Sequence, residues 1–527
     1  MIRHDEKYTS IPDVVRVAAR EYGGAAAIID ADEVWSFQDL EERMVDAARA
    51  FVALGVQPGD RFAVCGPNSA RWIQAALGIH AAGGILVPLN TRLKTPELSH
   101  ILRKSGAVGV ITVSEFLGND YVTMIRAAAE GAPAADRIVL LDDTTDDRAV
   151  GFADFIAGGE AVDPAVVTQR IDALTGDDYS DVMFTSGTTG APKGVKLKHS
   201  QSVRAFGYLT GVFGFRPGDV FPVIPPFFHT FGYKAGWLAN LIHGVTTIPM
   251  RTFDPQLLMQ TIQHHRASVL LGPPTLFVDI MNHPDRGTYD LSSLRIGVPS
   301  AANVAIKVYE DMRDVLGFET VLSAYGLTEA TSFVSTSHPG DDLAIIASTV
   351  GRAGEGIEVI VADAEGRPLP VGETGELFVR GYNVMDGYWE DDAATREAIT
   401  DDGYLRTGDI GSLDEAGNIR ITDRKKDMFI VGGFNAYPAE IEALLGGFDK
   451  ILHVAVIGAP DVRLGEVGAA FVVPKVPGDL TAEEVIAYAR EHMANFKVPR
   501  HVRIMDELPR NASMKVLKNQ LRELLDA

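Results

Sequence analysis

The chain has almost no cysteine and a shortage of positive charge. Its 527 residues include one cysteine, Cys65, which excludes intramolecular disulfides and any metal site that needs several thiolates. Lysine and arginine number 48 against 71 aspartate and glutamate residues, so the formal net charge is −23. Nucleic-acid binding needs clustered basic residues, and this balance therefore argues against a nucleic-acid partner.

Long hydrophobic runs are also missing. The longest nearly uncharged stretch, residues 75–89, is interrupted by His80 and Pro88 and is shorter than the roughly 20 apolar residues that a membrane-spanning helix needs. The first seven residues contain no apolar segment of the kind found in secretory signals. We therefore expect a cytoplasmic protein with no membrane span, either an enzyme or a binding protein.

What the sequence does contain is an alternation of strand-like and helical patterns. Up to about residue 350, β-rich runs such as 61–65 and 84–88 alternate with stretches of helical spacing such as 72–79. This alternation is typical of βαβ units and predicts parallel sheet.

Beyond residue 350 the pattern changes twice. Short strands such as 357–362, separated by turn residues, predict a small antiparallel β region, and after the charged run 423–427 an α+β pattern returns. The expected fold class is therefore α/β plus α+β. We predict a large N-terminal domain, residues 1–425, and a small mobile C-terminal domain, residues 426–527, with the hinge near Lys426.

The most informative segment is the glycine-rich run 184–194. Four hydroxyl side chains, three glycines and Lys193 lie within its eleven residues. Glycine lets backbone N–H groups approach an anion, hydroxyls donate hydrogen bonds and lysine supplies charge, so the run favours phosphate binding over a merely flexible surface loop. It is not a Walker A loop, because Gly194 stands where serine or threonine should follow the lysine.

This run resembles the phosphate-binding motif of the adenylate-forming superfamily of acyl-CoA synthetases, adenylation domains and luciferases. Four further segments resemble that family's second signature, ribose-binding motif, hinge and CoA-facing loop, in the family's order: 324–329, 404–409, 423–427 and 432–442. The resemblance implies two half-reactions. A carboxylate attacks the α-phosphate of ATP in the presence of Mg²⁺, and after rotation of the C-terminal domain the thiol of coenzyme A displaces AMP from the acyl-adenylate.

The resemblance also assigns roles around the nucleotide. Lys193 and the loop hydroxyls would hold the β- and γ-phosphates, and Glu329 would bind Mg²⁺, a cation that prefers oxygen ligands. Without the motifs, Glu329 would be interpreted as a surface carboxylate and Asp409 as a turn residue. The full implied set, with the glycines facing CoA, is Thr185, Ser186, Gly187, Thr188, Thr189, Gly190, Lys193, Ala301, Ala302, Tyr325 (adenine), Asp409 (ribose), Arg424, Gly432 and Gly433.

Residues 225–233 hold four aromatic residues and a histidine. They fit a core segment with one satisfied histidine, but the resemblance makes His229 a gate beside the acyl carboxylate and favours an acyl pocket. Ser300 stands where the family usually has glycine, and would narrow that pocket or offer a hydrogen bond. The implied substrate-binding residues are Phe228, His229, Gly232, Ser300 and Gly326.

Near the C-terminus, Lys515 matches the family's adenylation lysine, whose ammonium would bridge the attacking carboxylate and the α-phosphate. The implied catalytic set is Lys515, His229, Thr328 and Glu329. The residue before the lysine is Met514, where the family has glycine, and a side chain forced to positive φ costs on the order of 1–3 kcal/mol. Either the loop tolerates Met514, or adenylation is weakened and a partner ligase supplies the acyl-adenylate. A third alternative is a catalytically silent regulator that binds nucleotide.

Three segments bear on the acid that is activated. Residues 228–236, 422–424 and 494–497 look most like actinobacterial ligases that act on steroid-ring fragments. This resemblance implies a bulky alicyclic or terpenoid acid, or its acyl-adenylate, with ATP, Mg²⁺ and coenzyme A. Free coenzyme A is favoured over a carrier protein because no carrier domain is attached.

Overall fold

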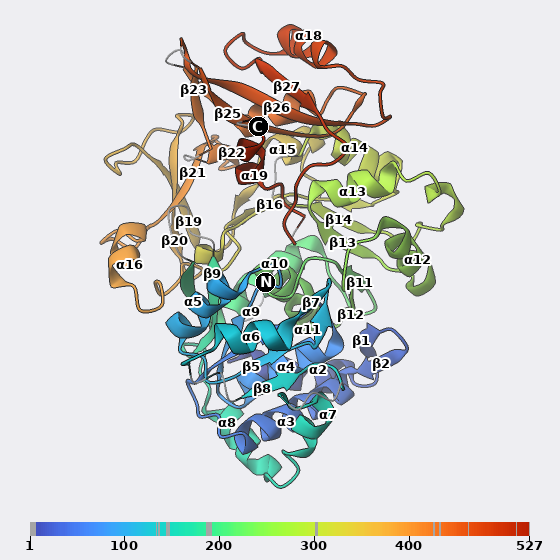
Figure 1. Ribbon diagram of the computed structural model, residues 1–527, viewed down its shortest axis with the longest axis vertical. Coiled ribbons are helices and arrows are strands. Elements are labelled where there is room, and N and C mark those ends of the chain that lie inside the picture. The colour runs from blue at the N-terminus through green and yellow to red at the C-terminus, as the bar shows by residue number, and fades with distance from the viewer. Residues whose placement is uncertain are drawn as a thin grey trace.

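The computed structural model describes residues 7–132, 134, 137–143, 148–185, 192–300, 304–424, 427–431, 434–461, 463–512 and 514–525, without the side chains of residues 423, 424, 434 and 435. The predicted mixture of α/β and α+β structure is confirmed. Figure 1 shows the strands between residues 429 and 504 and the helix of residues 482–492 (orange to red) at one end of the molecule and the helix of residues 37–53 (blue) toward the other. The predicted boundary at residues 425 and 426 lies outside the described residues and stays a prediction.

Mainly parallel sheets form the first 330 residues. The strand orders are β10-β9-β4-β3-β5-β8, β11-β12-β1-β2 and β13-β14-β15, and only the β10–β9 and β1–β2 pairs are antiparallel. These strands are β1 (Ala26–Asp30), β2 (Glu33–Ser36), β3 (Arg61–Cys65), β4 (Ile85–Pro88), β5 (Val110–Thr112), β8 (Ile138–Leu140), β9 (Tyr179–Thr185), β10 (Lys193–Lys198), β11 (Val220–Val223), β12 (Thr246–Pro249), β13 (Val269–Gly272), β14 (Ile296–Pro299) and β15 (Thr320–Val321); a separate hairpin pairs β6 (Glu115–Phe116) with β7 (Asn119–Asp120).

Antiparallel sheets follow, as the change of pattern near residue 350 predicted. They are β16 (Ala324–Tyr325), β17 (Ser335–Thr336) and β18 (Arg352–Ala353), and then β19 (Ile357–Ala362), β20 (Gly375–Gly381), β21 (Leu405–Leu413) and β22 (Ile419–Arg424). The C-terminal sheet contains β23 (Phe429–Val431), β24 (Phe434–Ala436), β25 (Ile451–Asp461), β26 (Gly465–Pro474) and β27 (His501–Ile504). Two small hydrophobic clusters, one with Ile441 and Val485 and one with Leu508 and Leu521, give this last part a core of its own.

The helices pack on the sheets and begin where the sequence places caps. Ser69 accepts a hydrogen bond from Trp72 N at the start of α4, and Thr481 and Glu484 form a capping box at the start of α18. The α-helices are α2 (Ile11–Tyr22), α3 (Phe37–Ala53), α4 (Ala70–Ala81), α5 (Thr95–Ser105), α6 (Tyr121–Ala128), α7 (Phe152–Ala157), α8 (Pro164–Ala173), α9 (His199–Phe213), α10 (Thr230–Gly232), α11 (Ala239–His243), α12 (Pro255–His265), α13 (Pro274–Met281), α14 (Ile306–Asp314), α15 (Leu343–Ser348), α16 (Asp392–Ala398), α17 (Pro438–Leu445), α18 (Ala482–His492) and α19 (Lys518–Glu523). A π-helical turn, η2 (Tyr233–Leu238), follows α10, and two 3₁₀ turns are η3 (Arg286–Thr288) and η4 (Thr328–Ala330).

This architecture brings several predicted site segments to strand ends. Thr185 ends β9, and Ser300 directly follows β14, whose last residue pairs with Gly272 at the end of β13. Ligands of open α/β sheets bind outside the carboxyl ends of the strands, so these positions suit a binding site. No helix in the described part of the chain is long and apolar enough to span a bilayer.

Candidate functional site

The two ends of the glycine-rich loop lie side by side. Thr185 and Lys193 are paired in the antiparallel β9–β10 ladder. The loop residues between them with predicted roles, Ser186, Gly187, Thr188, Thr189 and Gly190, lie outside the described residues. On its other side, β10 pairs with a later segment of the chain, because Trp389 N donates to Gly194 O at 2.6 Å. That pairing places Tyr388 opposite Val195, near the start of β10.

Tyr388 joins the phosphate side of the site to the predicted magnesium ligand. The ammonium of Lys193 lies 5.2 Å from the centre of the Tyr388 ring, and the Tyr388 hydroxyl donates to Glu329 Oε1 at 3.1 Å. Burial and then the charge of Glu329 raise the pKa of Tyr388, so the phenol stays a donor. Nothing in the sequence pattern singled out Tyr388.

Thr328 and Glu329 open the 3₁₀ turn η4, and the turn is held from outside as well. Met385 N donates to Glu329 O at 2.8 Å, which fixes the backbone of the turn while Tyr388 orients its carboxylate. Among the described residues no three histidine, cysteine, aspartate or glutamate side chains gather as a metal site. A magnesium ion held by one carboxylate and by substrate phosphates needs no such gathering, and Glu329 fits that role.

The predicted adenine and ribose residues also meet. The Tyr325 hydroxyl donates to Asp409 Oδ2 at 2.5 Å, and Asp409 is only 3% exposed. Asp409 lies inside strand β21, not at a turn, and its N–H donates to Thr407 Oγ1 at 3.0 Å. Across the β21–β22 ladder it pairs with Arg424, whose side chain is not described. The two motifs therefore lie together in the structure, although Tyr325 and Asp409 are 84 residues apart in the chain.

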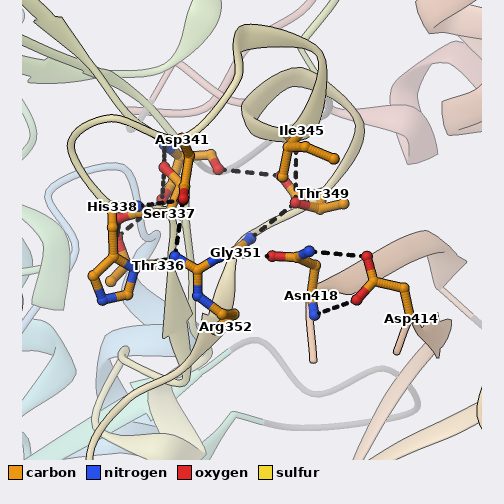
Figure 2. A network of polar contacts seen from close by, with 11 residues as sticks. Thr336, Ser337, His338, Asp341, Ile345, Thr349, Gly351, Arg352, Asp414 and Asn418 are labelled. Carbon is orange, nitrogen blue, oxygen red and sulfur yellow. Dashed lines mark hydrogen bonds and ion pairs between the residues drawn. The ribbon is translucent and has the colours of Figure 1, made fainter. Parts of the chain in front are cut away.

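A polar network joins the short sheet that carries Tyr325, the predicted adenine residue, to the sheet that carries Asp409, the predicted ribose residue (Figure 2). Arg352, on β18, donates to both carboxylate oxygens of Asp341 at 3.0 and 3.2 Å and to Asn418 Oδ1 at 3.3 Å. Asn418 in turn donates from Nδ2 to Asp414 Oδ2 at 2.8 Å. Because Arg352 contacts both sheets, it helps keep the adenine and ribose residues in register.

On the acyl side, His229 forms the N-cap of α10. Its Nδ1 accepts from Phe231 N at 3.1 Å, so in the neutral ring the proton is on Nε2. The surrounding protein atoms, and next the positive charge of Lys515, lower the pKa of His229 to about 4, although the residue as a whole is exposed. A neutral imidazole with its proton on Nε2 can donate a hydrogen bond to a substrate carboxylate.

Packing leaves no room for a side chain at two glycines of the predicted pocket. A Cβ added at Gly232 would lie 2.1 Å from Pro225 O, and one at Gly326 would lie 2.2 Å from the Ser332 backbone. Thr230, next to His229, shares a hydrogen bond with the hydroxyl of Ser332. The His229 segment and the turn that carries Glu329 therefore lie against each other.

The remaining predicted residues of this side are placed only in part. Phe228 is buried, and Ser300 is half-buried with its N–H donating to Gly272 O at 2.9 Å. The predicted residues Ala301, Ala302, Gly432 and Gly433 lie outside the described residues.

Lys515 lies in a tight hairpin, and its positive charge acts on His229. Asn511 N donates to Lys515 O at 2.8 Å, Lys515 N donates to Asn511 Oδ1 at 2.9 Å, and Met514 N donates to Asn511 O at 2.9 Å. Met514 has φ of 64°, the left-handed conformation that glycine favours. The conformation expected from the family's glycine is therefore adopted by methionine, with these hydrogen bonds of the hairpin formed.

A buried ion pair, which the sequence analysis did not identify, lies behind both halves of the site. Lys234 Nζ is 3.0 Å from Asp181 Oδ2, and both side chains are fully buried. Asp181 belongs to β9, which leads to the glycine-rich loop, whereas Lys234 belongs to η2, which follows His229. The pair therefore connects the phosphate side of the site with the acyl side.

Comparison with known proteins identifies the relatives of this chain. Residues 15–389 match the family model described as AMP-binding enzyme, and residues 440–515 match its C-terminal domain. A 3-[(3aS,4S,7aS)-7a-methyl-1,5-dioxo-octahydro-1H-inden-4-yl]propanoyl:CoA ligase of Rhodococcus jostii is 44% identical over 98% of this chain and 99% of its own length. The ligase of the same name from Mycobacterium tuberculosis is 45% identical over 98% and 99%.

Among solved structures, the anthranilate CoA ligase AuaEII in complex with anthranoyl-AMP is similar. It has a TM-score of 0.89 and 25% identity, with 98% of each chain covered. The match of the family model over most of the chain, the near full-length relatives and the shared fold lead to one conclusion: the chain belongs to the AMP-binding enzyme family.

Proposed function

We propose that this protein is an AMP-forming acid–thiol ligase that converts a bulky alicyclic acid, of the indane-propanoate type, into its coenzyme A thioester. One structural observation supports the reaction: Tyr388 contacts both Lys193 and Glu329, and the Thr230–Ser332 hydrogen bond joins the His229 segment to the turn that carries Glu329. The 44–45% identity to two ligases for a methyl-dioxo-octahydroindenyl propanoate supports the substrate class.

In the first half-reaction, an oxygen of the substrate carboxylate attacks the α-phosphorus of ATP, and pyrophosphate leaves. The ammonium of Lys515 neutralises negative charge between the carboxylate and the α-phosphate, and the Nε2–H of His229 donates to the carboxylate. Lys193 faces the phosphates that leave. Magnesium, held by Glu329, would supply additional positive charge against the phosphates. Tyr388 keeps the Glu329 carboxylate oriented throughout.

In the second half-reaction, the thiol sulfur of coenzyme A attacks the acyl carbonyl carbon, AMP leaves with the bonding electron pair, and the thiol proton passes to solvent. In this proposal Lys515 serves the first step, and the C-terminal domain, residues 426–527, then rotates about a hinge near Lys426 to present its loop at 432–442. The polarised acyl-adenylate needs no further activation by Lys515. The two steps therefore depend on different residues.

Assaying the two half-reactions separately tests the proposal. The first assay contains acid, ATP and Mg²⁺ and follows pyrophosphate; the second contains synthetic acyl-adenylate and coenzyme A and follows thioester. We expect both to proceed with indane-propanoate acids and the first to be slow with linear fatty acids. Lys515→Ala should lower the first rate about 10²–10³-fold and leave the second unchanged. AMP binding without turnover in either assay would contradict the proposal and indicate a regulator.

The same assays decide the significance of Met514. Because hydrogen bonds with Asn511 already hold the backbone of Lys515 in the native hairpin, we expect Met514→Gly to adenylate at close to the native rate. The variant should change stability little, since relief of strain of on the order of 1–3 kcal/mol is offset in part by the greater backbone freedom of glycine. A rise in pyrophosphate release of about 10²-fold or more would instead mean that native adenylation is impaired and that a partner ligase supplies the adenylate.

A further inference from the structure

A single carboxylate, Asp279 on α13, contacts two separate segments of the C-terminal part of the chain. His453 Nε2, on β25, lies 2.9 Å from Asp279 Oδ1, and Arg510 Nη1 lies 3.5 Å from Asp279 Oδ2. The side chain of His453 is 9% exposed, that of Asp279 is 21% exposed and that of Arg510 is 19% exposed. The half-buried Asp279 therefore links α13 to the C-terminal part of the chain, and each of its carboxylate oxygens contacts a different residue.

One of these partners stands at the base of the catalytic hairpin. Arg510 pairs with Val516 in an antiparallel bridge, and the residues between them include Met514 and Lys515. Arg510 Nε is buried and has no hydrogen-bond partner among the described residues, so the contact with Asp279 is important for this guanidinium. Removing the Asp279 charge leaves a partly buried cation unpaired, which is strongly unfavourable.

We propose that Asp279 is a positioning residue for adenylation: through Arg510 and His453 it anchors the C-terminal domain against α13 in the arrangement that brings Lys515 to the site. This inference rests on the proposed two-step function. The chain of contacts runs from Asp279 to Arg510 and along the hairpin to Lys515, whose positive charge acts on His229. Asp279 itself does not touch the reacting groups in this scheme.

The anchor has opposite consequences for the two half-reactions. Adenylation needs Lys515 in place, and small displacements of a catalytic group are expensive in rate. Thioester formation in the proposed scheme needs the C-terminal domain to leave this arrangement, so an anchor that favours one arrangement does not help the other. Loss of Asp279 should therefore slow the first step and leave the second unchanged or faster.

The test compares Asp279→Asn with Asp279→Glu and with Asp290→Asn. Asp290 is a matched control, because its ion pair with Arg266 at 3.2 Å stays within the N-terminal part of the chain. We expect Asp279→Asn to lower pyrophosphate release about 10–100-fold without slowing thioester formation from acyl-adenylate. Asp279→Glu should restore part of the loss, and Asp290→Asn should behave as native protein.

Two further measurements separate positioning from general damage. In a Lys515→Ala background, Asp279→Asn should cause no additional loss of adenylation, because the lysine that it positions is already gone. In NMR titrations, the pKa of His229 should rise in Asp279→Asn, as it should in Lys515→Ala, because the positive charge of Lys515 has moved away. An unchanged pKa of His229, or an equal slowing of both half-reactions, would overturn the inference.

Failure of the proposed ligase function can be distinguished from failure of the proposed role of Asp279. If native protein released no pyrophosphate with any acid, the ligase proposal would fail. The titration of His229 would still report whether Asp279 holds Lys515 in place, because that measurement needs no turnover. Adenylation by native protein together with a native rate for Asp279→Asn would overturn the anchor alone.

Discussion

Replacing one member of the buried Asp181–Lys234 pair should damage the N-terminal part of the protein far more than replacing both. Lys234→Met keeps the length of the side chain and removes its charge. Asp181 would then be an ionised carboxylate with no exposed surface and with the hydroxyl of Ser180, 2.6 Å from Oδ2, as its main remaining donor. Breaking a buried pair in this way costs about 3–5 kcal/mol, a large share of the roughly 5–15 kcal/mol that stabilises a domain.

The double variant Lys234→Met with Asp181→Asn removes both charges. The amide oxygen can still accept from Ser180, and the Ser202 hydroxyl, which accepts from Lys234 at 2.7 Å, keeps the Lys198 carbonyl as an acceptor at 3.4 Å. We therefore expect the double variant to lose about 1–2 kcal/mol, less than Lys234→Met alone.

The charges around the pair also predict the pH dependence of Lys234→Met. Burial opposes ionisation of Asp181, but the charge of Lys234, the interaction with His80 and the hydrogen bonds of the carboxylate outweigh burial and hold its pKa below the usual value. Without the lysine, burial would raise that pKa. A carboxyl whose pKa is raised on folding destabilises the native state above its unfolded pKa, so the loss in Lys234→Met should shrink as the pH falls toward 4.

Urea unfolding followed by tryptophan fluorescence measures these effects. The four tryptophans, Trp35, Trp72, Trp237 and Trp389, all precede residue 390, so the signal reports the N-terminal part of the chain, and the Trp237 ring stacks on Tyr233 beside the pair at 4.6 Å. The reasoning would be refuted if the double variant lost as much stability as Lys234→Met or more, or if Lys234→Met lost less than about 1 kcal/mol.

Two further predictions follow from the contacts of Tyr388 and from two buried histidines. Tyr388→Phe removes the hydrogen bond to Glu329, worth about 1.5–3 kcal/mol, so the Mg²⁺ concentration that half-saturates adenylation should rise about tenfold while thioester formation is unchanged; an unaltered Mg²⁺ dependence would contradict it. Burial lowers the pKa of His80 to about 4 and of His199 to about 3, whereas a histidine in the unfolded chain has a pKa of about 6.5. Below that pH the unfolded state therefore binds more protons than the native state. The free energy of unfolding should therefore fall as the pH drops, by about 1 kcal/mol for each histidine between pH 6.5 and 5.5, and a flat stability in urea unfolding over that range would argue against this.

The sequence alone predicted the fold class and the family because both depend on local patterns. The β-rich run 61–65 became β3, and the helical spacing at 72–79 became part of α4, since hydrophobic periodicity and caps act over a few residues. The left-handed φ at Met514 was also foreseeable from the sequence, because a position that normally takes glycine reports a backbone conformation that is set by its immediate neighbours.

The tertiary structure alone decided which of these local features meet. Tyr388 reaches Glu329 across 59 residues, and His453 reaches Asp279 across 174. No local pattern marks such partners, because a tyrosine or an aspartate acquires its role only when strand pairing and domain docking place an opposite group within hydrogen-bond distance. The motifs thus determined the chemistry that the chain can attempt, whereas long-range packing determined which side chains orient the groups that carry it out.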